Sequence, residues 1–265
     1  MDQEIDKPAV SESVSADDTD CRGPVQDIQI GPALRKKTWA CVILAMILPF
    51  LGSLFYFAIL KQSLVAKGLY ASVKVFTIVW PLIAIYWIGV RRRARLDESK
   101  GRHLKSLPLG AISGIVIGCF IIALFNLTPA HEYVTQMAPK LRERIEFFGI
   151  NSVATYFAWC AFLAGIHSLI EEFFWRWFVF ETLLTLVSRP LAYGLAGLSF
   201  ALHHYVICWQ YVSPIGALIF GTSVGVGGVI WCWMVNRQRS LAGAWLSHAL
   251  VDVAIFIVGY QMLFA

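Results

Sequence analysis

Two adjacent glutamates and an arginine interrupt an otherwise apolar stretch, in the run IEEFFWR over residues 170–176. On a helix, Glu172 and Arg176 are four residues apart and can pair directly, whereas Glu171 projects about 100° away from that contact. The Glu172 carboxylate is then neutralised by a guanidinium. The Glu171 carboxylate is left in a dry site without that partner, which is the environment of a general base. The alternative is a buried packing network of all three side chains.

Adjacent histidines form a second group in the run FALHH over residues 200–204. His203 and His204 project about 100° apart on a helix, so we expect only one of them to join the Glu171 carboxylate. A neutral imidazole can take or relay a proton from water. The alternative is a hydrogen-bonded histidine of the core.

A third group pairs His248 with Asp252, four residues later in the run HALVD. The two side chains share one helix face, so Asp252 can orient the imidazole or help to polarise a bound carbonyl. A pair that only stabilises its helix is the alternative. His167 shares a face with Glu171 in the same way, either as support for the site or as plain packing.

All these ionisable residues lie in sequence that is apolar enough for a membrane. The chain has 265 residues, of which 58% are hydrophobic and 15% charged, whereas soluble domains are about 45–50% apolar and about 25% charged. Crossing the hydrocarbon core takes about 20 apolar helical residues. We predict an all-α, polytopic transmembrane bundle of about seven to eight helices, with spans near 39–60, 70–90, 107–128, 153–172, 190–209, 213–235 and 241–263.

Two segments between the spans need an interpretation of their own. Residues 129–152 combine two prolines with a mixed charged run, which predicts an amphipathic helix on the outer surface. Residues 173–187 follow a complete span, and we expect a second helix near the cytoplasmic interface, with an eighth, short span as the alternative. Glycines four residues apart, as at Gly110, Gly114 and Gly118, predict close helix packing.

The charge distribution predicts the domain organisation and the orientation. Residues 1–30 hold eight acids and two bases, so 1–38 is expected to be a disordered, acidic cytoplasmic tail that ends in a basic patch. The transmembrane domain is 39–265. Lys and Arg concentrate before the first span and in the loops at 91–106 and 236–240, which predicts a multi-pass membrane protein with a cytoplasmic N-terminus.

A charged group at the bilayer centre costs about 2.5–3.5 kcal/mol on insertion scales, so such residues mark a functional site by default. The three groups, in this order and on successive helices, resemble the CPBP family of intramembrane proteases. That family includes type II CAAX prenyl endopeptidases and bacteriocin-processing or self-immunity proteins. Its EExxxR motif matches Glu171, Glu172 and Arg176; its FxxxH motif matches Phe200 and His204; and its HxxxN or HxxxD motif matches His248 and Asp252.

The resemblance covers roughly residues 150–264 and implies an endopeptidase. It implies that Glu171 and His204 activate a water for attack on a peptide carbonyl, and that His248 with Asp252 stabilises the oxyanion. Glu172, Arg176 and Phe200 are then structural support, with His167 and His203 further from the chemistry. Asp252 stands where the prenyl endopeptidases commonly have Asn. Asp252 donates to an oxyanion only when protonated, and its alternative role is to fix the tautomer of His248.

We expect no cofactor, because the sequence has no H-E-x-x-H motif that compels a metal. The alternative is a zinc site made of His204 and His248 with Glu171 or Asp252. The expected partners are the lipid bilayer and a peptide or protein substrate, lipidated or membrane-anchored, and no nucleic acid. Two other functions remain open: a proton-coupled transporter, because the same residues suit a proton relay, and a catalytically silent immunity or scaffold protein.

Overall fold

The computed structural model describes residues 31–60, 63–92 and 100–264. Of the predicted disordered tail, 1–38, residues 1–30 lie outside the described residues, whereas 32–38 already form the start of α1. Residues 93–99 of the basic loop at 91–106 also lie outside the described residues. Within the described ranges the chain is helical and has no strand. The elements are α1 Pro32–Ser53, η1 Leu54–Ile59, α2 Leu64–Leu82, η2 Ile83–Trp87, α3 Lys100–Leu127, α4 Ala130–Thr135, α5 Ala138–Phe147, α6 Val153–Phe162, η3 Leu163–His167, α7 Ser168–Glu172, η4 Phe173–Phe180, α8 Glu181–Leu183, α9 Arg189–Tyr211, α10 Pro214–Gln238 and α11 Ala242–Phe264, where η marks π-helical segments.

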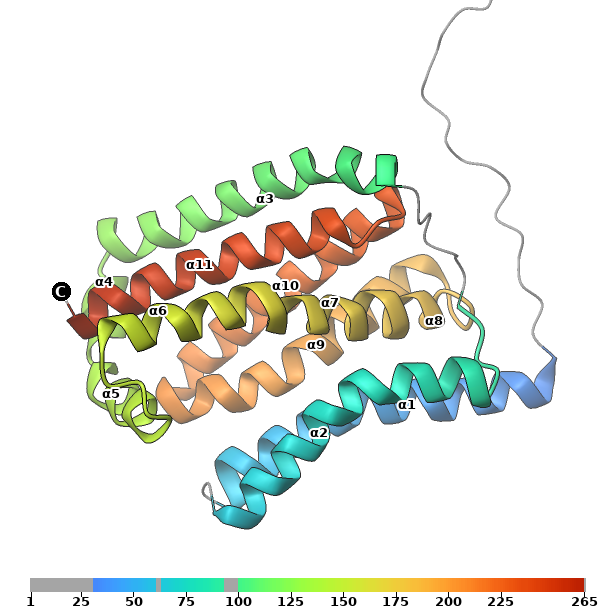
Figure 1. The fold of residues 1–265 in the computed structure, drawn as a ribbon, viewed down its shortest axis with the longest axis horizontal. Coiled ribbons are helices and arrows are strands. Elements are labelled where there is room, and N and C mark those ends of the chain that lie inside the picture. The colour runs from blue at the N-terminus through green and yellow to red at the C-terminus, as the bar shows by residue number, and fades with distance from the viewer. Residues whose placement is uncertain (1–30, 61–62, 93–99, 265) are drawn as a thin grey trace, which may run out of the picture.

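In the described part of the chain, seven helices are long and apolar enough to cross a membrane. The prediction of an all-α membrane bundle is therefore confirmed. Three pairs of helices pack side by side: α3 with α11, α9 with α10, and α1 with α2 (Figure 1). The α1–α2 hairpin lies along one side of the bundle, and the continuous run from α6 to α8 lies between the hairpin and the α3–α11 pair (Figure 1).

Local sequence signals explain where several helices begin. Ser152 and Thr155 form a reciprocal capping box at the start of α6. The Ser213 hydroxyl accepts from the backbone N–H of Gly216 at the start of α10, where Pro214 occupies the first turn. Proline is favoured in the first turn because a backbone N–H at that position would have no helical hydrogen-bond partner, so nothing is lost when it is absent. The first cap marks the start of the helix that leads to the glutamate motif, and the second marks the start of α10, which packs against α9.

The glycine stripe on α3 brings this helix against α11, as predicted. A Cβ atom at Gly110 would overlap the carbonyl oxygen of Gly243, and one at Gly114 would lie 2.9 Å from the carbonyl oxygen of Ser247. Backbones can approach this closely only where side chains are absent. Because α11 carries His248, this contact helps to set the depth and rotation of the third motif.

The expected interfacial helix over residues 173–187 is wrong. The helix that begins at Val153 continues without interruption to Leu183, through two π-helical segments on either side of α7. Its second half is the most deeply buried part of the molecule, with Phe174, Phe178 and Phe180 fully inaccessible. A break is predicted because a helix surrounded by lipid needs only about 20 residues to cross the membrane. The second half of this helix is surrounded by protein instead, so that limit does not apply to it.

The segment expected to form one amphipathic helix, 129–152, contains two short helices instead. The break falls between Thr135 and Ala138, where Pro139 occupies the first turn of α5. Arg144 on α5 is buried rather than solvated: its guanidinium donates to the Tyr56 hydroxyl at 2.8 Å and lies 4.4 Å from the centre of the Phe148 ring. Arg144 therefore holds this segment against the α1–α2 hairpin through its hydrogen bond to Tyr56, and its guanidinium also contacts aromatic rings.

Basic segments that are distant in sequence meet at one end of the bundle. The Arg35 guanidinium, at the start of α1, donates to the carbonyl of Leu186 at 2.8 Å. The His103 ring is 2.8 Å from the Ser240 hydroxyl, which joins the start of α3 to the α10–α11 loop. The C-terminus of α11 lies at the opposite end (Figure 1). The start of α1, the start of α3 and the α10–α11 loop thus share one side, as the alternating spans require.

Candidate active site

Glu172 is the hub of a buried ionic network. Its Oε1 atom lies 3.0 Å from Nη1 of Arg176 and 2.8 Å from Nδ1 of His248. Glu172 and Arg176 are fully inaccessible and His248 is 5% exposed. The four-residue spacing predicts the first contact, but the second joins α7 to α11 and could not be read from the chain. Removing Glu172 or Arg176 would leave a buried charge without its partner.

Aromatic rings enclose the Arg176 guanidinium. Its carbon atom lies 4.4 Å from the centre of the Phe200 ring and 4.9 Å from that of Trp231. Both distances fall within the range of a cation–π contact, which gains strength where water is excluded. Phe200, the first residue of the second motif, therefore supports the first motif directly.

Glu171 has a separate set of partners, as expected from its different direction on the helix. Its Oε1 atom lies 3.2 Å from Nε2 of His167 and 3.8 Å from Nε2 of His203, and its Oε2 atom lies 3.8 Å from Nε2 of His248. No arginine is paired with it in the described residues. Three imidazoles from three helical segments thus surround one carboxylate.

Of the two adjacent histidines, His203 is the one nearest to Glu171. The His203 ring is 5% exposed and lies parallel to Trp175, with ring centres 5.8 Å apart. Nδ1 of His204 faces the carbonyl of Phe200 at 2.9 Å, and its ring centre is 4.0 Å from that of His203. The motif singles out His204, whereas the rotation of α9 turns His203 toward the carboxylate.

The orientation of His248 is set by Glu172 rather than by Asp252. A carboxylate paired with arginine can only accept, so Nδ1 of His248 carries the proton in its 2.8 Å contact with Glu172. Nε2 faces the opposite way, toward Glu171 and toward Oδ1 of Asp252, each 3.8 Å distant. The expectation that Asp252 fixes the tautomer is therefore not met by this geometry.

A tryptophan that sequence reasoning did not single out holds His248 from the other side. The Trp231 ring stacks on the imidazole with centres 4.0 Å apart. Its indole N–H donates to the Ser247 hydroxyl at 3.0 Å, and that hydroxyl also accepts from Ser113 at 2.7 Å. These bonds join α3, α10 and α11 around the imidazole.

The π-helical segment η3 frees a backbone group next to the motif. A π turn displaces the regular hydrogen-bond ladder and is common at functional sites. Here the carbonyl of Gly165 accepts from the Trp245 indole at 2.9 Å. The bond ties α11 to the helix that carries Glu171, at a position two residues before His167.

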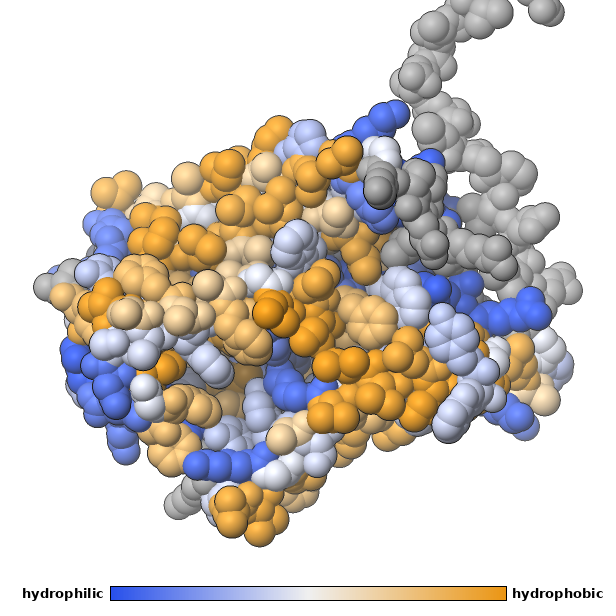
Figure 2. All heavy atoms as spheres, viewed as in Figure 1, coloured by the Kyte–Doolittle hydropathy of each residue, from blue (hydrophilic) through white to orange (hydrophobic). Residues whose placement is uncertain are grey.

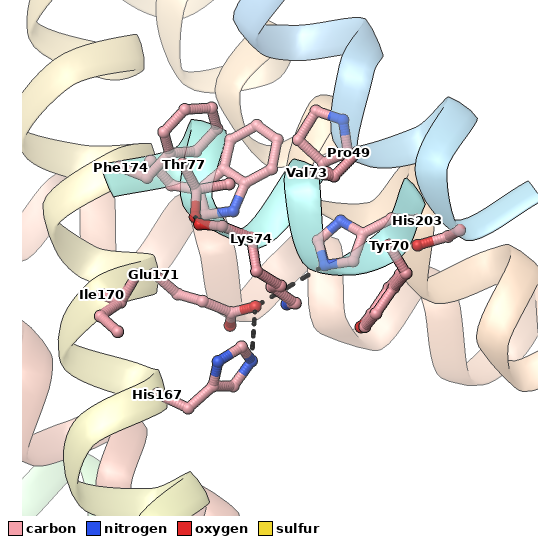
Figure 3. Close-up of a pocket in the computed structure, with 12 residues that line it drawn as sticks. Pro49, Tyr70, Val73, Lys74, Thr77, His167, Ile170, Glu171, Phe174 and His203 are labelled. Atoms are coloured by element: carbon pink, nitrogen blue, oxygen red, sulfur yellow. Dashed lines mark hydrogen bonds and ion pairs between the residues drawn. The ribbon is translucent and has the colours of Figure 1, made fainter. Parts of the chain in front are cut away.

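A small cavity opens beside the Glu171 carboxylate (Figure 3). Its volume is about 20 Å³, enough for one water, since a buried water needs roughly 10–15 Å³ of such space and two to four polar partners. The polar residues that line it are Ser53, Tyr70, Lys74 and Thr77 from the α1–α2 hairpin, and His167, Glu171 and His203 from the bundle.

Lys74 is a member of this cavity that sequence reasoning missed. It is the one lysine within the apolar run over residues 70–90, so the rule that intramembrane charges mark function would have found it. Glu181 was missed as well: it is fully buried at the start of α8, but the assignment of residues 173–187 to an interface made a charge there unremarkable.

The proposed zinc set does not come together in the described residues. There, no group of three or more His, Cys, Asp or Glu side chains is arranged to hold a metal ion. Nδ1 of His204 faces a backbone carbonyl, and Nδ1 of His248 is bonded to Glu172. Zinc needs about three converging ligands, which His204 and His248 with either acid do not supply in this arrangement.

One comparison with known proteins matches the part of the chain that holds the site. Residues 152–254 match the family model described as "Type II CAAX prenyl endopeptidase Rce1-like". No curated protein and no solved structure matches the chain. The matched range includes all three motifs and excludes α1, α2 and α3. The part of the chain that holds this site therefore resembles the CPBP family of intramembrane proteases.

Proposed function

We propose that this protein is an endopeptidase that hydrolyses a peptide bond near the membrane surface, with a water molecule as the nucleophile. One observation carries the proposal: the cavity beside Glu171 has room for one water and presents His167, His203 and Glu171 to it. A carboxylate and neutral imidazoles around an enclosed water are the groups that general-base hydrolysis requires.

In this mechanism Glu171 takes a proton from the water as its oxygen attacks the carbonyl carbon. Of the two adjacent histidines on α9, His203 is the nearer to this carboxylate, at 3.8 Å, and it relays or stabilises the transferred proton. We therefore favour His203 for the role that the FxxxH motif assigns to His204. The proton then passes to the leaving amine as the C–N bond breaks, so the water is fully used and no group is consumed.

His248 is the proposed stabiliser of the tetrahedral oxyanion. Nδ1 donates to Glu172, so Nε2 can donate to an oxyanion only when the ring is doubly protonated. The carboxylates of Glu172 and Asp252 on either side favour that imidazolium form electrostatically. Asp252 then acts as a counter-ion, with Oδ1 at 3.8 Å from Nε2, and need not itself donate. Preorganised charge of this kind is often the largest single contribution to catalysis.

The proposed substrate is a peptide or protein that reaches the site from the bilayer, lipidated or membrane-anchored. Hydrophilic residues lie in a hollow between α2 and the body of the bundle, with hydrophobic surface above it and to its right (Figure 2). A lipid-attached chain could approach such a hollow sideways without leaving the membrane. CAAX-type tails, leader peptides and C-terminal sorting tails share this property.

The proposed reaction uses no metal. We expect strong chelators to leave the activity of the purified protein unchanged, because Glu171 and an imidazole activate the water without a Lewis acid. Elemental analysis of the same preparation provides the control. One zinc per chain, with activity lost on its removal and restored on its return, would contradict the metal-free mechanism but not the family.

The proposal is tested by comparing termini in membranes that contain the wild-type protein or the Glu171→Gln variant. New protein termini should accumulate only with the wild type, and an S-farnesyl peptide that ends in a CAAX sequence should be cleaved by the purified protein in liposomes. A proton-coupled carrier would acidify or empty the liposomes and cleave nothing. A silent scaffold would give identical termini for both proteins.

A further inference from the structure

Lys74 is a charged residue in a position where charge is expensive. It lies within the membrane-spanning helix from Lys67 to Trp87, outside the range that matches the protease family. An ammonium at this depth costs free energy unless it has a partner, and by default it serves function. None of the roles in the proposed mechanism uses it.

The ammonium group has no ionic or hydrogen-bonding partner in the described residues. The centre of the Tyr70 ring lies 5.4 Å from Nζ. An ammonium has three donors to satisfy. Since the side chain lines the cavity instead of the lipid face, its donors point toward the space that a substrate must occupy.

Glu171 is the natural candidate for the missing counter-ion, but its oxygens face other groups. Oε1 lies within 3.8 Å of two imidazoles and Oε2 within 3.8 Å of a third. Lys74 interacts with the carboxylate electrostatically yet does not form an ion pair with it. Figure 3 shows the lysine reaching from α2 toward the same cavity that Glu171 faces from the bundle.

From this arrangement we propose that Lys74 binds a carboxylate of the substrate close to the scissile bond. The inference rests on the proposed peptidase function and narrows the substrate to peptides with an anionic group on this side. The carboxylate is either the C-terminus of a short released fragment or an acidic side chain. In a site shielded from water, each would need a cation to offset its desolvation, and the flexible side chain of lysine can adjust to the position of either carboxylate.

The test uses pairs of peptides that differ in one negative charge. The first pair is an S-farnesyl peptide ending in a CAAX sequence, with a free C-terminal carboxylate or a C-terminal amide. The second pair is amidated and carries Glu or Gln at the residue after the scissile bond. Binding is measured on the Glu171→Gln protein in liposomes, so the readout does not depend on cleavage. We expect one pair to show about 10- to 100-fold tighter binding of the acid, the usual worth of a hydrogen bond to a charged group.

Variants of the lysine decide the assignment. Lys74→Met should remove the acid preference, and Lys74→Arg should restore most of it. Lys67→Met is the matched control, because Lys67 is an exposed lysine on the same helix whose ammonium lies 4.0 Å over the Phe147 ring; the preference should survive there. A lysine that merely balances the Glu171 charge would change both members of a pair equally.

The possible results separate this proposal from the proposed function. Equal binding of acid and amide, or an acid preference that survives Lys74→Met, overturns the role of Lys74 and leaves the peptidase intact. Failure of the wild-type protein to cleave either acidic peptide or its neutral partner, while the Lys74-dependent preference in binding persists, contradicts the peptidase mechanism and not the carboxylate site. The pair that shows the preference identifies the source of the carboxylate.

Discussion

At the scale of single residues, the two adjacent glutamates have different tasks. Glu172→Gln should lower the melting temperature and the yield of inserted protein, because Arg176 and His248 both lose their anionic partner; breaking such a buried pair costs about 3–5 kcal/mol. Glu171→Gln should keep the wild-type melting temperature and lose hydrolysis. Thermal unfolding in detergent and a cleavage assay on the same preparations measure the two effects. Equal stability with activity retained in both variants would refute this division.

The adjacent histidines provide a second comparison between matched variants. His203→Ala should reduce kcat by about 10²–10⁴-fold, the usual contribution of acid–base assistance, because its Nε2 atom lies 3.8 Å from the Glu171 carboxylate. His204→Ala should have the smaller effect, since its Nδ1 atom faces a backbone carbonyl. A larger loss of kcat in His204→Ala than in His203→Ala would assign the proton relay to His204, as the motif does.

At the scale of helices, the contact of α3 with α11 holds the third motif in place. Gly110→Ala inserts a methyl group into the Gly243 backbone, and overpacking of this kind costs about 1–3 kcal/mol. We expect lower stability together with lower activity, because α11 carries His248. Gly194→Ala on α9 is the control, since nothing lies within 4 Å of its Cβ position. Unfolding curves of both variants test the prediction, and equal curves would contradict it.

The uninterrupted helix from Val153 to Leu183 shows how an element combines two environments. Its first part exposes Phe157 and Phe162 at 52% and 43%, as expected for a lipid-facing span. Its last part is buried in protein. The two glutamates lie between π-helical segments at this transition, where the hydrogen-bond ladder is already altered.

At the scale of the whole molecule, orientation remains a prediction from the basic segments. Cysteines introduced at exposed positions 237 and 140, in a background without native cysteines, should differ in labelling by a membrane-impermeant thiol reagent. The second should react from outside the cell and the first only after permeabilisation, because Lys and Arg concentrate on the cytoplasmic side. Labelling of position 237 in intact cells would invert the topology.

The sequence by itself determined that this protein lies in a lipid bilayer, and it determined which neighbouring residues pair within one helix of the site. Seven spans follow from length and hydropathy, because lipid requires about 20 apolar helical residues to satisfy the backbone. The contacts of Glu172 with Arg176 and of His167 with Glu171 follow from four-residue spacing, because helix geometry is local. Neither inference needs to know how the helices pack.

The tertiary structure decided everything that depends on the rotation of one helix against another. His203 rather than His204 lies next to Glu171, His248 is joined to Glu172 across 76 residues, and Lys74 reaches the cavity from a helix outside the motifs. A rotation of about 100° separates one neighbour from the next on a helix. Which of two neighbouring residues faces the site therefore depends on how the whole helix is rotated. Non-local packing, such as the contact of Gly110 with Gly243, sets that rotation, and the sequence alone does not reveal it.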